Sequence, residues 1–442
     1  MVLRVHALTY TQTRRCCFER EYITPKQYLG GKSDLPPNTL FDTGRSHSIT
    51  MRPYSNTAHP CYSVPMTTTR FIIASSSDPA MRYAVPYHVS DPFIYIEQSG
   101  TKTVLIGILE YEAMREALAG SDIVVEKLEP YLREAKERAP NAPRDALPIV
   151  IAEHFGMLEG EIVVPPSFPL HIADLLRDAG AELRDARPFS PERAVKRAEE
   201  IASIEQALGD TCNAFRHIEQ VLHEASIDTD GTLHYKDAPL TSERLKREVE
   251  HILLDHELLA SEGMIIAGGV QSAIPHHEGA GVLRAHEPII CDIFPRHRPS
   301  GYFADMTRTY WKGEPSEQYI TRYIAVLEAH VRALVTIRPG ATGAEVHAAC
   351  TEAFIERGIE TADDTGFIHS TGHGLGIELH EEPNLSPHNT APLVAGNVVT
   401  VEPGLYFPGW GGIRIEDVVV VTEDGYRDLT TYPKTLEDSI IM

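Results

Sequence analysis

Five residues in the second half of the sequence have the side-chain types that bind divalent metal ions. They are four carboxylates and one imidazole: Asp292, Asp305, His373, Glu402 and Glu416. Such oxygen and nitrogen ligands suit Mn, Co, Fe or Zn ions when rigid elements present them. Two ions that share a bridging hydroxide need about five protein ligands, mostly anionic, to offset their charge. The set therefore favours a dinuclear metal site.

The four acids interrupt apolar, strand-like sequence. Asp292 lies in Ile289–Phe294, for example, and Glu416 lies in Ile413–Asp417. A carboxylate inside a run of β-branched residues is costly to bury without a partner. An exposed strand edge would explain any one of the candidate ligands, but it is a poor explanation for five of them within 125 residues.

Apolar periodicity predicts the elements that must position these side chains. Helices are predicted from an N-cap at Ser190 to about Leu222, from Ser242 to Gly263, over Glu317–Ile337 and over Gly343–Arg357. Strands are predicted at Met264–Ala267, Pro288–Phe294, Phe303–Tyr310, Gly366–Ser370, Val398–Glu402 and Gly412–Thr422. This order of helices, strands, helices and strands predicts an α+β domain with two similar halves.

A smaller α/β domain is predicted over residues 66–188. Strand-like runs at Arg70–Ala74, Thr103–Leu109, Asp122–Val125 and Pro148–Ala152 alternate with helical runs at Tyr111–Leu118 and Leu128–Arg138. Short strands that alternate with helices are typical of α/β folds. Its sequence holds no phosphate loop and no metal-ligand cluster, so we assign this domain no chemistry.

Residues 1–65 differ in charge from the rest of the sequence. They hold eight Lys or Arg residues and four acids, a net charge of +4 that leaves −27 for the remainder. They have no sustained apolar period, so we do not expect them to pack as a domain. A transit peptide and an over-long reading frame with the true start at Met66 both fit this leader, and we favour the second.

The composition excludes several classes of partner. The 442 residues carry a formal net charge of −23, which argues against nucleic acid or an anionic membrane as the main partner. No apolar run approaches the roughly 18 residues of a membrane span. The six cysteines form neither a disulfide framework nor a zinc-finger pattern. We therefore expect a cytoplasmic protein, or an organellar one if 1–65 is a transit peptide.

Four motifs together resemble the pita-bread metallopeptidases, the family of methionine aminopeptidase, aminopeptidase P, prolidase and metal-free creatinase. The motifs are Asp292 with Asp305-Met-Thr-Arg-Thr309, Gly372-His-Gly-Leu-Gly376 with His380-Glu-Glu-Pro383, Val401-Glu-Pro-Gly404, and Arg414-Ile-Glu-Asp417. The resemblance implies a pita-bread catalytic domain with pseudo-symmetric halves at 189–442. It also implies a creatinase-like N-terminal domain at 66–188.

The resemblance assigns a role to each candidate ligand and implies two divalent metal ions per chain. Asp292 and Asp305 would bind one ion, and His373 and Glu402 would complete the site of the other. Asp305 and Glu416 would bridge both ions. A hydroxide held between them would be the nucleophile, because two cations lower its pKa, and Glu402 would shuttle a proton. We expect manganese, with cobalt, iron or zinc as alternatives, because mixed oxygen and nitrogen sites accept several ions.

Two further histidines match substrate-binding positions of the family. His380, seven residues after His373, matches the histidine that hydrogen-bonds the substrate near the scissile carbonyl. His276 matches the histidine that stabilises the tetrahedral gem-diolate, although His277 is adjacent and the spacing to Asp292 is one residue shorter than expected. Because the chain has 21 histidines, a packed or surface position is the alternative for His276.

His369 and Arg414 favour the proline-directed branch of the family. Prolidase and aminopeptidase P have a histidine at the position that His369 matches, and it would contribute to the proline-side pocket. Arg414 matches another residue of that branch and would orient the carboxylates, with a strand-edge arginine as the alternative. The resemblance therefore implies a peptidase that removes an N-terminal residue before proline, as an Xaa-Pro aminopeptidase or an Xaa-Pro dipeptidase. Relatives with this N-terminal domain are commonly homodimers, so we expect one here.

The sequence departs from the family pattern in two places. The spacing from Asp292 to Asp305 is two residues longer than usual, and we expect a hairpin tip through 295–301 to absorb the difference. Strict dipeptidases bind the substrate's C-terminal carboxylate with an arginine before the Val-Glu-Pro-Gly strand, but Ile377–Thr400 contains no Lys or Arg. This absence makes action on longer peptides at least as plausible as dipeptidase activity.

Two other functions are compatible with the same fold. A metal-dependent lyase or a non-peptide hydrolase is the first alternative, since a fold does not determine chemistry. An inactive peptidase-like binding module is the second, but such a protein should have lost ligands, and all five are present.

Overall fold

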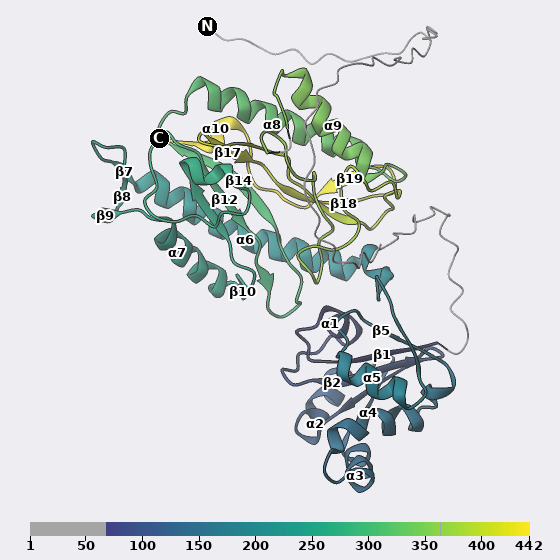
Figure 1. The fold of residues 1–442 in the computed structure, drawn as a ribbon. Helices are drawn as coiled ribbons and strands as arrows, with labels where there is room; N and C mark the ends of the chain where they lie inside the picture. The colour runs from purple at the N-terminus through teal and green to yellow at the C-terminus, as the bar shows by residue number, and fades with distance from the viewer. Residues whose placement is uncertain (1–67, 363) are drawn as a thin grey trace, which may run out of the picture. The chain divides into compact units, whose positions relative to one another are not determined.

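The computed structural model of the chain describes residues 68–442 apart from residue 363 (Figure 1). The predicted leader, residues 1–65, and the alternative start at Met66 lie outside the described residues. No helix in the described part of the chain is long and apolar enough to cross a membrane.

The first part of the described chain forms a six-stranded mixed sheet in the order β4-β3-β2-β1-β5-β6. Its strands are β1 (Thr69–Ala74), β2 (Phe93–Gln98), β3 (Thr101–Ile106), β4 (Ile123–Lys127), β5 (Glu161–Val164) and β6 (Glu182–Asp185). The helices are α1 (Pro79–Ala84), α2 (Ile108–Ala117), α3 (Glu129–Arg138), α4 (Pro143–His154) and α5 (Leu170–Asp178). Successive residues Phe71 and Ile72 of β1 belong to different hydrophobic clusters, so both faces of the sheet are buried.

One predicted strand in this region is wrong. Pro148–Ala152 is not a strand but part of helix α4, in which Val150, Ile151 and Ala152 are buried. A short apolar run can be a buried strand or a buried helix segment, and periodicity alone does not separate the two. The predicted strand Thr103–Leu109 also ends earlier, because β3 stops at Ile106 and α2 begins at Ile108.

Three small sheets of the second part carry or flank the candidate carboxylates and Arg414. The first has the order β11-β12-β14-β20, with β11 (Ile265–Gly268), β12 (Ile289–Ile293), β14 (Met306–Lys312) and β20 (Ile440–Ile441). The second consists of β15 (Val398–Val401), β18 (Asp417–Val421) and β19 (Tyr426–Asp428), and the third is the hairpin of β16 (Gly404–Phe407) and β17 (Gly411–Arg414).

Two pairs of helices cover these strands from opposite sides (Figure 1). The first pair is α6 (Ala198–Glu224) with α7 (Ser242–Asp255), and the second is α8 (Glu317–Thr336) with α9 (Gly343–Glu356). Val398 of β15 packs in one core with α6 and α7, whereas its neighbour Val399 packs in another core with α8 and α9. This arrangement agrees with the predicted α+β domain of two halves.

The predicted helix from Ser190 begins later than its N-cap signal indicates. Pro191–Ala194 forms only a short 3-10 turn, and α6 starts at Ala198. The backbone N–H of Arg197 donates to Glu200 Oε2 at 2.8 Å, so a residue inside the helix caps its start. Helix α7 ends at Asp255, before the predicted Gly263, because the backbone of Glu257 has a positive φ of 56°.

Two predicted strands near the site are also wrong in extent. Gly366–Ser370 contributes only an isolated bridge between Gly366 and Tyr406. Gly412–Thr422 is interrupted at Ile415–Glu416, which separates β17 from β18. Both sequences are apolar enough for strands, but the local apolar pattern does not contain the change of pairing partner.

The longer spacing between Asp292 and Asp305 leaves the ladder between β12 and β14 intact. Asp292 pairs with Thr307, and Ile293 pairs with Met306. The intervening segment forms β13 (Arg296–His297), which pairs with β10 (Leu258–Leu259). The additional length is therefore accommodated outside the strands that hold the two aspartates.

Candidate metal centre

A cavity of about 980 Å³ contains all nine residues that the sequence predicts for the site. Its lining includes Asp292, Asp305, His373, Glu402, Glu416, His276, His369, His380 and Arg414. These residues come from segments up to 140 positions apart, so only the tertiary fold brings them together. The structure thus places them in one site, and their individual roles stay predictions.

The candidate carboxylates lie on or directly beside strands. Asp292 is on β12, and Asp305 immediately precedes the neighbouring strand β14. Glu402 immediately follows β15, and Glu416 immediately precedes the neighbouring strand β18. The backbone N–H of Glu416 donates to the carbonyl of Thr307 at 3.1 Å, which joins the two sheets at the site.

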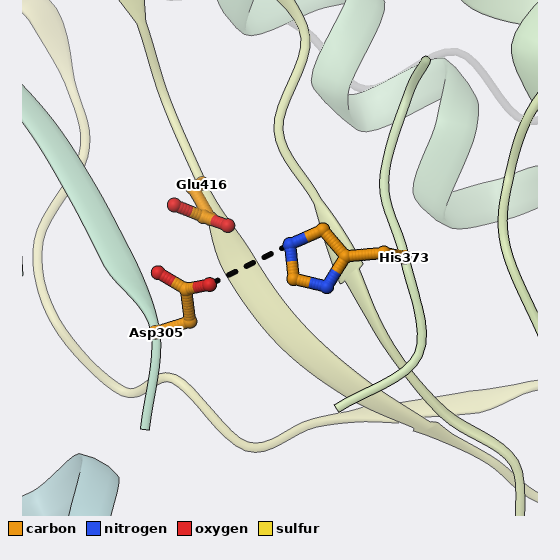
Figure 2. A group of neighbouring side chains, drawn as sticks. All are labelled: Asp305, His373 and Glu416. Carbon is orange, nitrogen blue, oxygen red and sulfur yellow. Dashed lines mark ion pairs between the residues drawn. The ribbon is translucent and has the colours of Figure 1, made fainter. Parts of the chain in front are cut away.

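Three of the candidate ligands form a compact group. One ligand atom each of Asp305, His373 and Glu416 lies within 4.8 Å of the others. Figure 2 shows their side chains pointing toward one another, and His373 Nε2 is 3.6 Å from Asp305 Oδ2. The same nitrogen is 3.4 Å from Glu402 Oε1. Such a group of two acids and an imidazole has the chemistry of a divalent metal site.

The carboxylates of the group repel one another. Burial, followed by the charge of Glu416, raises the pKa of Asp305 well above its usual value. Burial, followed by the charge of Glu402, does the same to Glu416. The pKa of Glu402 rises to about 8, again mainly through burial. These shifts mean that the cluster needs added positive charge to be fully ionised.

Asp292 provides a direct test of whether the site fits a metal ion. Its Oδ2 accepts from Arg414 Nη2 at 2.6 Å, while its buried Oδ1 has no partner among the described residues. A buried oxygen without a partner is rare in folded proteins, and a water molecule or a bound ion is the usual explanation. Together with the mutually repelling acids, this oxygen shows that the residues fit divalent metal ions.

Arg414 organises the cavity wall through three side chains. Besides Asp292, it donates from Nη1 to the Tyr406 hydroxyl at 2.6 Å and from Nε to Thr307 Oγ1 at 3.2 Å. Thr307 Oγ1 in turn donates to Glu416 Oε2 at 2.7 Å. The guanidinium therefore orients two of the candidate carboxylates, one directly and one through Thr307.

A second buried arginine, Arg308, connects strand β14 to the segment around Glu416 and Asp417 through hydrogen bonds. Arg308 Nη1 donates to the carbonyls of Thr307 at 2.8 Å and of Glu416 at 2.6 Å. Its Nη2 donates to Asp417 Oδ1 at 2.8 Å. Because a planar guanidinium makes these bonds in a defined geometry, Arg308 holds the backbone beside Glu416 in place.

His369 lies at the end of a chain of hydrogen bonds from Arg414. Its Nδ1 lies 2.7 Å from the Ser370 carbonyl, and its Nε2 lies 3.1 Å from the Tyr406 hydroxyl. Burial, then the charge of Arg414, lowers the pKa of His369 to about 3, so the ring is neutral. With Nδ1 donating to Ser370, Nε2 accepts from Tyr406, which fixes the orientation of the ring.

The glycines of Gly372-His-Gly-Leu-Gly376 allow the His373 loop to approach its neighbours. A Cβ at Gly372 would lie 1.9 Å from the Thr400 carbonyl oxygen, and one at Gly376 would lie 2.3 Å from Glu381 Oε1. His373 Nδ1 lies 3.1 Å from the Gly374 carbonyl, which leaves Nε2 to face the acids. Burial, followed by the charge of His380, lowers the pKa of His373 to about 4, so the imidazole is neutral and able to act as a ligand.

His380 lies beside His373 at the exposed side of the cavity. Their ring centroids are 4.2 Å apart. Burial, followed by the charge of His276, lowers the pKa of His380. His276 is exposed and lines the same cavity. This position suits both histidines for contact with a bound substrate rather than for structural packing.

Several residues that shape the site were not predicted. They are Thr307, Arg308, Thr400, Tyr406, Glu381, Arg193 and Lys196. Thr307 follows Asp305 by two residues, and strand alternation alone could have placed the two on one face. The contact of Tyr406 with Arg414 and that of Glu381 with residues near 195 have no local sequence signal.

Comparison with known proteins finds one matching family model and several related peptidases. A model of the metallopeptidase family M24 matches residues 202–423. The uncharacterized peptidase YqhT of Bacillus subtilis is 36% identical over 245 residues, which are 55% of this chain and 64% of the relative. The Xaa-Pro dipeptidase of Pyrococcus furiosus is 38% identical over 173 residues, 39% of this chain and 48% of the relative. The chain thus spans between about half and two thirds of the length of these curated relatives.

Solved structures match over a larger share of the chain. The prolidase from Pyrococcus furiosus has a TM-score of 0.66 and 26% identity, covering 83% of this chain and 96% of its own. The Xaa-Pro dipeptidase from Bacillus anthracis has a TM-score of 0.68 and 26% identity, with coverages of 84% and 94%. The X-Pro aminopeptidase from Thermotoga maritima has a TM-score of 0.67 and 25% identity, with coverages of 85% and 97%.

Proposed function

Because the chain belongs to metallopeptidase family M24 and has the predicted pita-bread fold, we propose that it is a dinuclear metal-dependent peptidase that removes an N-terminal residue before proline. The observation that carries this proposal is the set of four carboxylates and His373 around one cavity, with a buried oxygen of Asp292 left without a partner among the described residues. The names of the relatives and structural neighbours, which include Xaa-Pro dipeptidase, prolidase and X-Pro aminopeptidase, support the proline preference.

The proposed ligands are the five that the sequence predicts. Asp292 and Asp305 would hold one ion, His373 and Glu402 the other, with Asp305 and Glu416 shared between them. The ions, when bound, would lower the pKa of a water molecule and polarise the scissile carbonyl. We propose two ions per chain, with manganese preferred over cobalt, iron or zinc.

The remaining side chains would bind and orient the peptide. Glu402, whose Oε1 accepts from Thr400 at 3.1 Å, would carry a proton from the attacking water to the leaving proline nitrogen. His380 and His276 would donate hydrogen bonds to the substrate at the reacting carbonyl. His369 would form part of the wall that contacts proline, in the orientation that Tyr406 gives it.

A substrate panel tests the proposed function. The enzyme is purified without chelator, loaded with Mn²⁺ and assayed for release of the first residue from Met-Pro, Met-Pro-Gly and the matched controls Met-Ala and Met-Ala-Gly. We expect cleavage of the proline peptides and much slower cleavage of the alanine peptides. Cleavage of none of the four by protein that contains bound metal would contradict the proposal and favour a lyase or a non-peptide hydrolase.

The proposal also covers the oligomeric state of the protein and its location in the cell. We propose a homodimer in the cytoplasm, because relatives with this N-terminal domain are commonly dimers and the acidic chain does not favour nucleic acid or anionic membranes. Light scattering coupled to size-exclusion chromatography measures the dimer directly, and a monomer at micromolar concentration would refute it.

A further inference from the structure

Among the described residues that line the cavity, Arg296 is the one Lys or Arg side chain without an anionic partner. Among the described residues that line the cavity, only Arg296 and Arg414 are Lys or Arg. Arg414 uses its donors on Asp292, Tyr406 and Thr307. Arg296, by contrast, makes no ion pair within 4.0 Å in the part of the chain that the structure describes. The cavity therefore offers one guanidinium to a ligand.

Neighbouring groups contact Nε and the ring-facing side of the Arg296 guanidinium, but neither Nη group has a hydrogen-bond partner among the described residues. Nε donates to the Gly301 carbonyl at 2.9 Å, and the guanidinium carbon is 5.8 Å from the centre of the Phe303 ring. Glu262, which is exposed and lines the same cavity, attracts Arg296 without pairing with it. The Nη groups thus remain able to bind an anion as a pair of parallel donors.

The backbone that carries Arg296 is well supported. Arg296 lies on β13, where it pairs with Leu259, and both Pro295 and His297 beside it are buried. This strand belongs to the segment between Asp292 and Asp305 whose length departs from the family pattern. A strand pair therefore sets the position of the Arg296 backbone at the cavity wall.

The size and charge of the cavity suit a short peptide with a free carboxylate. A volume of about 980 Å³ is at the upper end of the range for pockets that enclose a drug-sized molecule, which suits a peptide of two or three residues. Four of the proposed metal ligands are acids, which would repel a carboxylate. Of the two arginines among the described lining residues, Arg414 already pairs with Asp292, so Arg296 is the one that can pair with a carboxylate of the ligand. A peptide with a free C-terminus has a carboxylate there, whatever its sequence.

We propose that Arg296 binds the C-terminal carboxylate of a di- or tripeptide substrate and makes the enzyme specific for short peptides. The inference rests on the proposed peptidase function. Arg296 would supply, from a different part of the sequence, the positive charge that the stretch Ile377–Thr400 lacks. An acidic side chain of a longer peptide has the same chemistry, and the experiment separates the two sources.

The test compares Met-Pro with Met-Pro amide, which share the scissile bond and differ in the terminal charge. We expect the wild-type enzyme, loaded with Mn²⁺, to favour the acid by about 10- to 100-fold in kcat/KM, the effect of one charged hydrogen-bonded pair. Arg296→Gln should reduce this ratio to below about threefold, mainly through KM, and Arg296→Lys should retain part of it. Arg298→Gln, on the neighbouring exposed residue that does not line the cavity, should keep the wild-type ratio.

Three outcomes would overturn the assignment. They are an equal rate on acid and amide in the wild type, an equal loss on both in Arg296→Gln, and an Arg296-dependent preference for Met-Pro-Glu amide over Met-Pro-Gln amide. If the wild type cleaves neither Met-Pro nor any other peptide of the substrate panel, the proposed function fails, and calorimetric binding of Met-Pro and its amide to both proteins still tests Arg296. Metal content and thermal unfolding of each variant, measured in parallel, exclude a general loss of structure.

Discussion

Lys196 Nζ lies 2.5 Å from Glu381 Oε1, and the two side chains are 1% and 8% exposed. Arg193 pairs with the other carboxylate oxygen of Glu381 and lies 2.8 Å from Glu378. Glu381 directly follows His380, and its backbone exchanges two hydrogen bonds of 2.9 Å with Gly374. The segment before helix α6 thus holds the loop that carries both His373 and His380.

Replacing Glu381 with Gln should destabilise the protein and disturb this loop. The change leaves the charges of Lys196 and Arg193 buried without their shared carboxylate, which costs about 3 to 5 kcal/mol in free energy of unfolding. Denaturant unfolding measures the loss. The matched control is Glu205→Gln, which removes an exposed partner of Arg427 and should cost less than about 1 kcal/mol. Equal effects of the two substitutions would show that the buried pairs do not hold the loop.

Gly376→Ala should impair both stability and turnover. The added Cβ would lie 2.3 Å from Glu381 Oε1, so either the loop or the carboxylate must move. We expect a cost of about 1 to 3 kcal/mol in free energy of unfolding, as for overpacking of a core. Gly209→Ala, in helix α6 with nothing within 4 Å, should instead stabilise the protein by about 0.5 to 1 kcal/mol. Thermal unfolding of both variants separates steric conflict from a general effect of alanine, and an unchanged Gly376→Ala protein would contradict the geometry.

His380→Ala should remove activity but not metal. If His380 donates to the reacting substrate, kcat falls by about 100-fold or more. The ratio of metal to protein, measured by mass spectrometry, should stay at the wild-type value because the proposed ligands are intact. His388→Ala, on an exposed histidine farther along the same loop, should leave both quantities unchanged. Loss of metal from His380→Ala would instead make His380 a ligand.

Arg308→Lys should weaken metal binding although it removes none of the proposed ligands. A lysine cannot replace the simultaneous contacts of Arg308 with the Thr307 and Glu416 carbonyls and Asp417. We expect the affinity for Mn²⁺ to fall by about 10- to 100-fold, as for other residues that orient metal ligands. Wild-type protein should gain about 2.7 kcal/mol in free energy of unfolding at a Mn²⁺ concentration 100 times Kd, and the variant should gain less at that concentration.

The control for Arg308→Lys is Arg332→Lys on helix α8. Arg332 pairs with Glu328 and Glu356 at the surface, far less buried than Arg308. Its replacement should leave Mn²⁺ affinity unchanged. An equal loss of affinity in both variants would refute the positioning role of Arg308.

Local sequence predicted most of the elements that carry the site. Helices α8 and α9 were predicted to within one residue at each end, since both begin at a side-chain N-cap, Ser316 and Thr342, and carry a clear apolar stripe. Pro148–Ala152 was misassigned because five apolar residues fit either a strand or a helix. Helix α7 was predicted too long because its apolar pattern continues into β10, which is a strand only through its pairing with β13.

The sequence by itself determined which side chains could bind metal, because acids and an imidazole inside apolar motifs are a local and specific signal. It did not determine how they are held. Arg414 contacts Asp292 across 122 residues, and Lys196 contacts Glu381 from a segment far earlier in the sequence. Arg296 falls in the hairpin tip predicted through 295–301, yet in the structure it pairs with Leu259 and lines the cavity. Only the tertiary structure decided these contacts, because they depend on how distant strands and loops pack together and not on any short-range pattern.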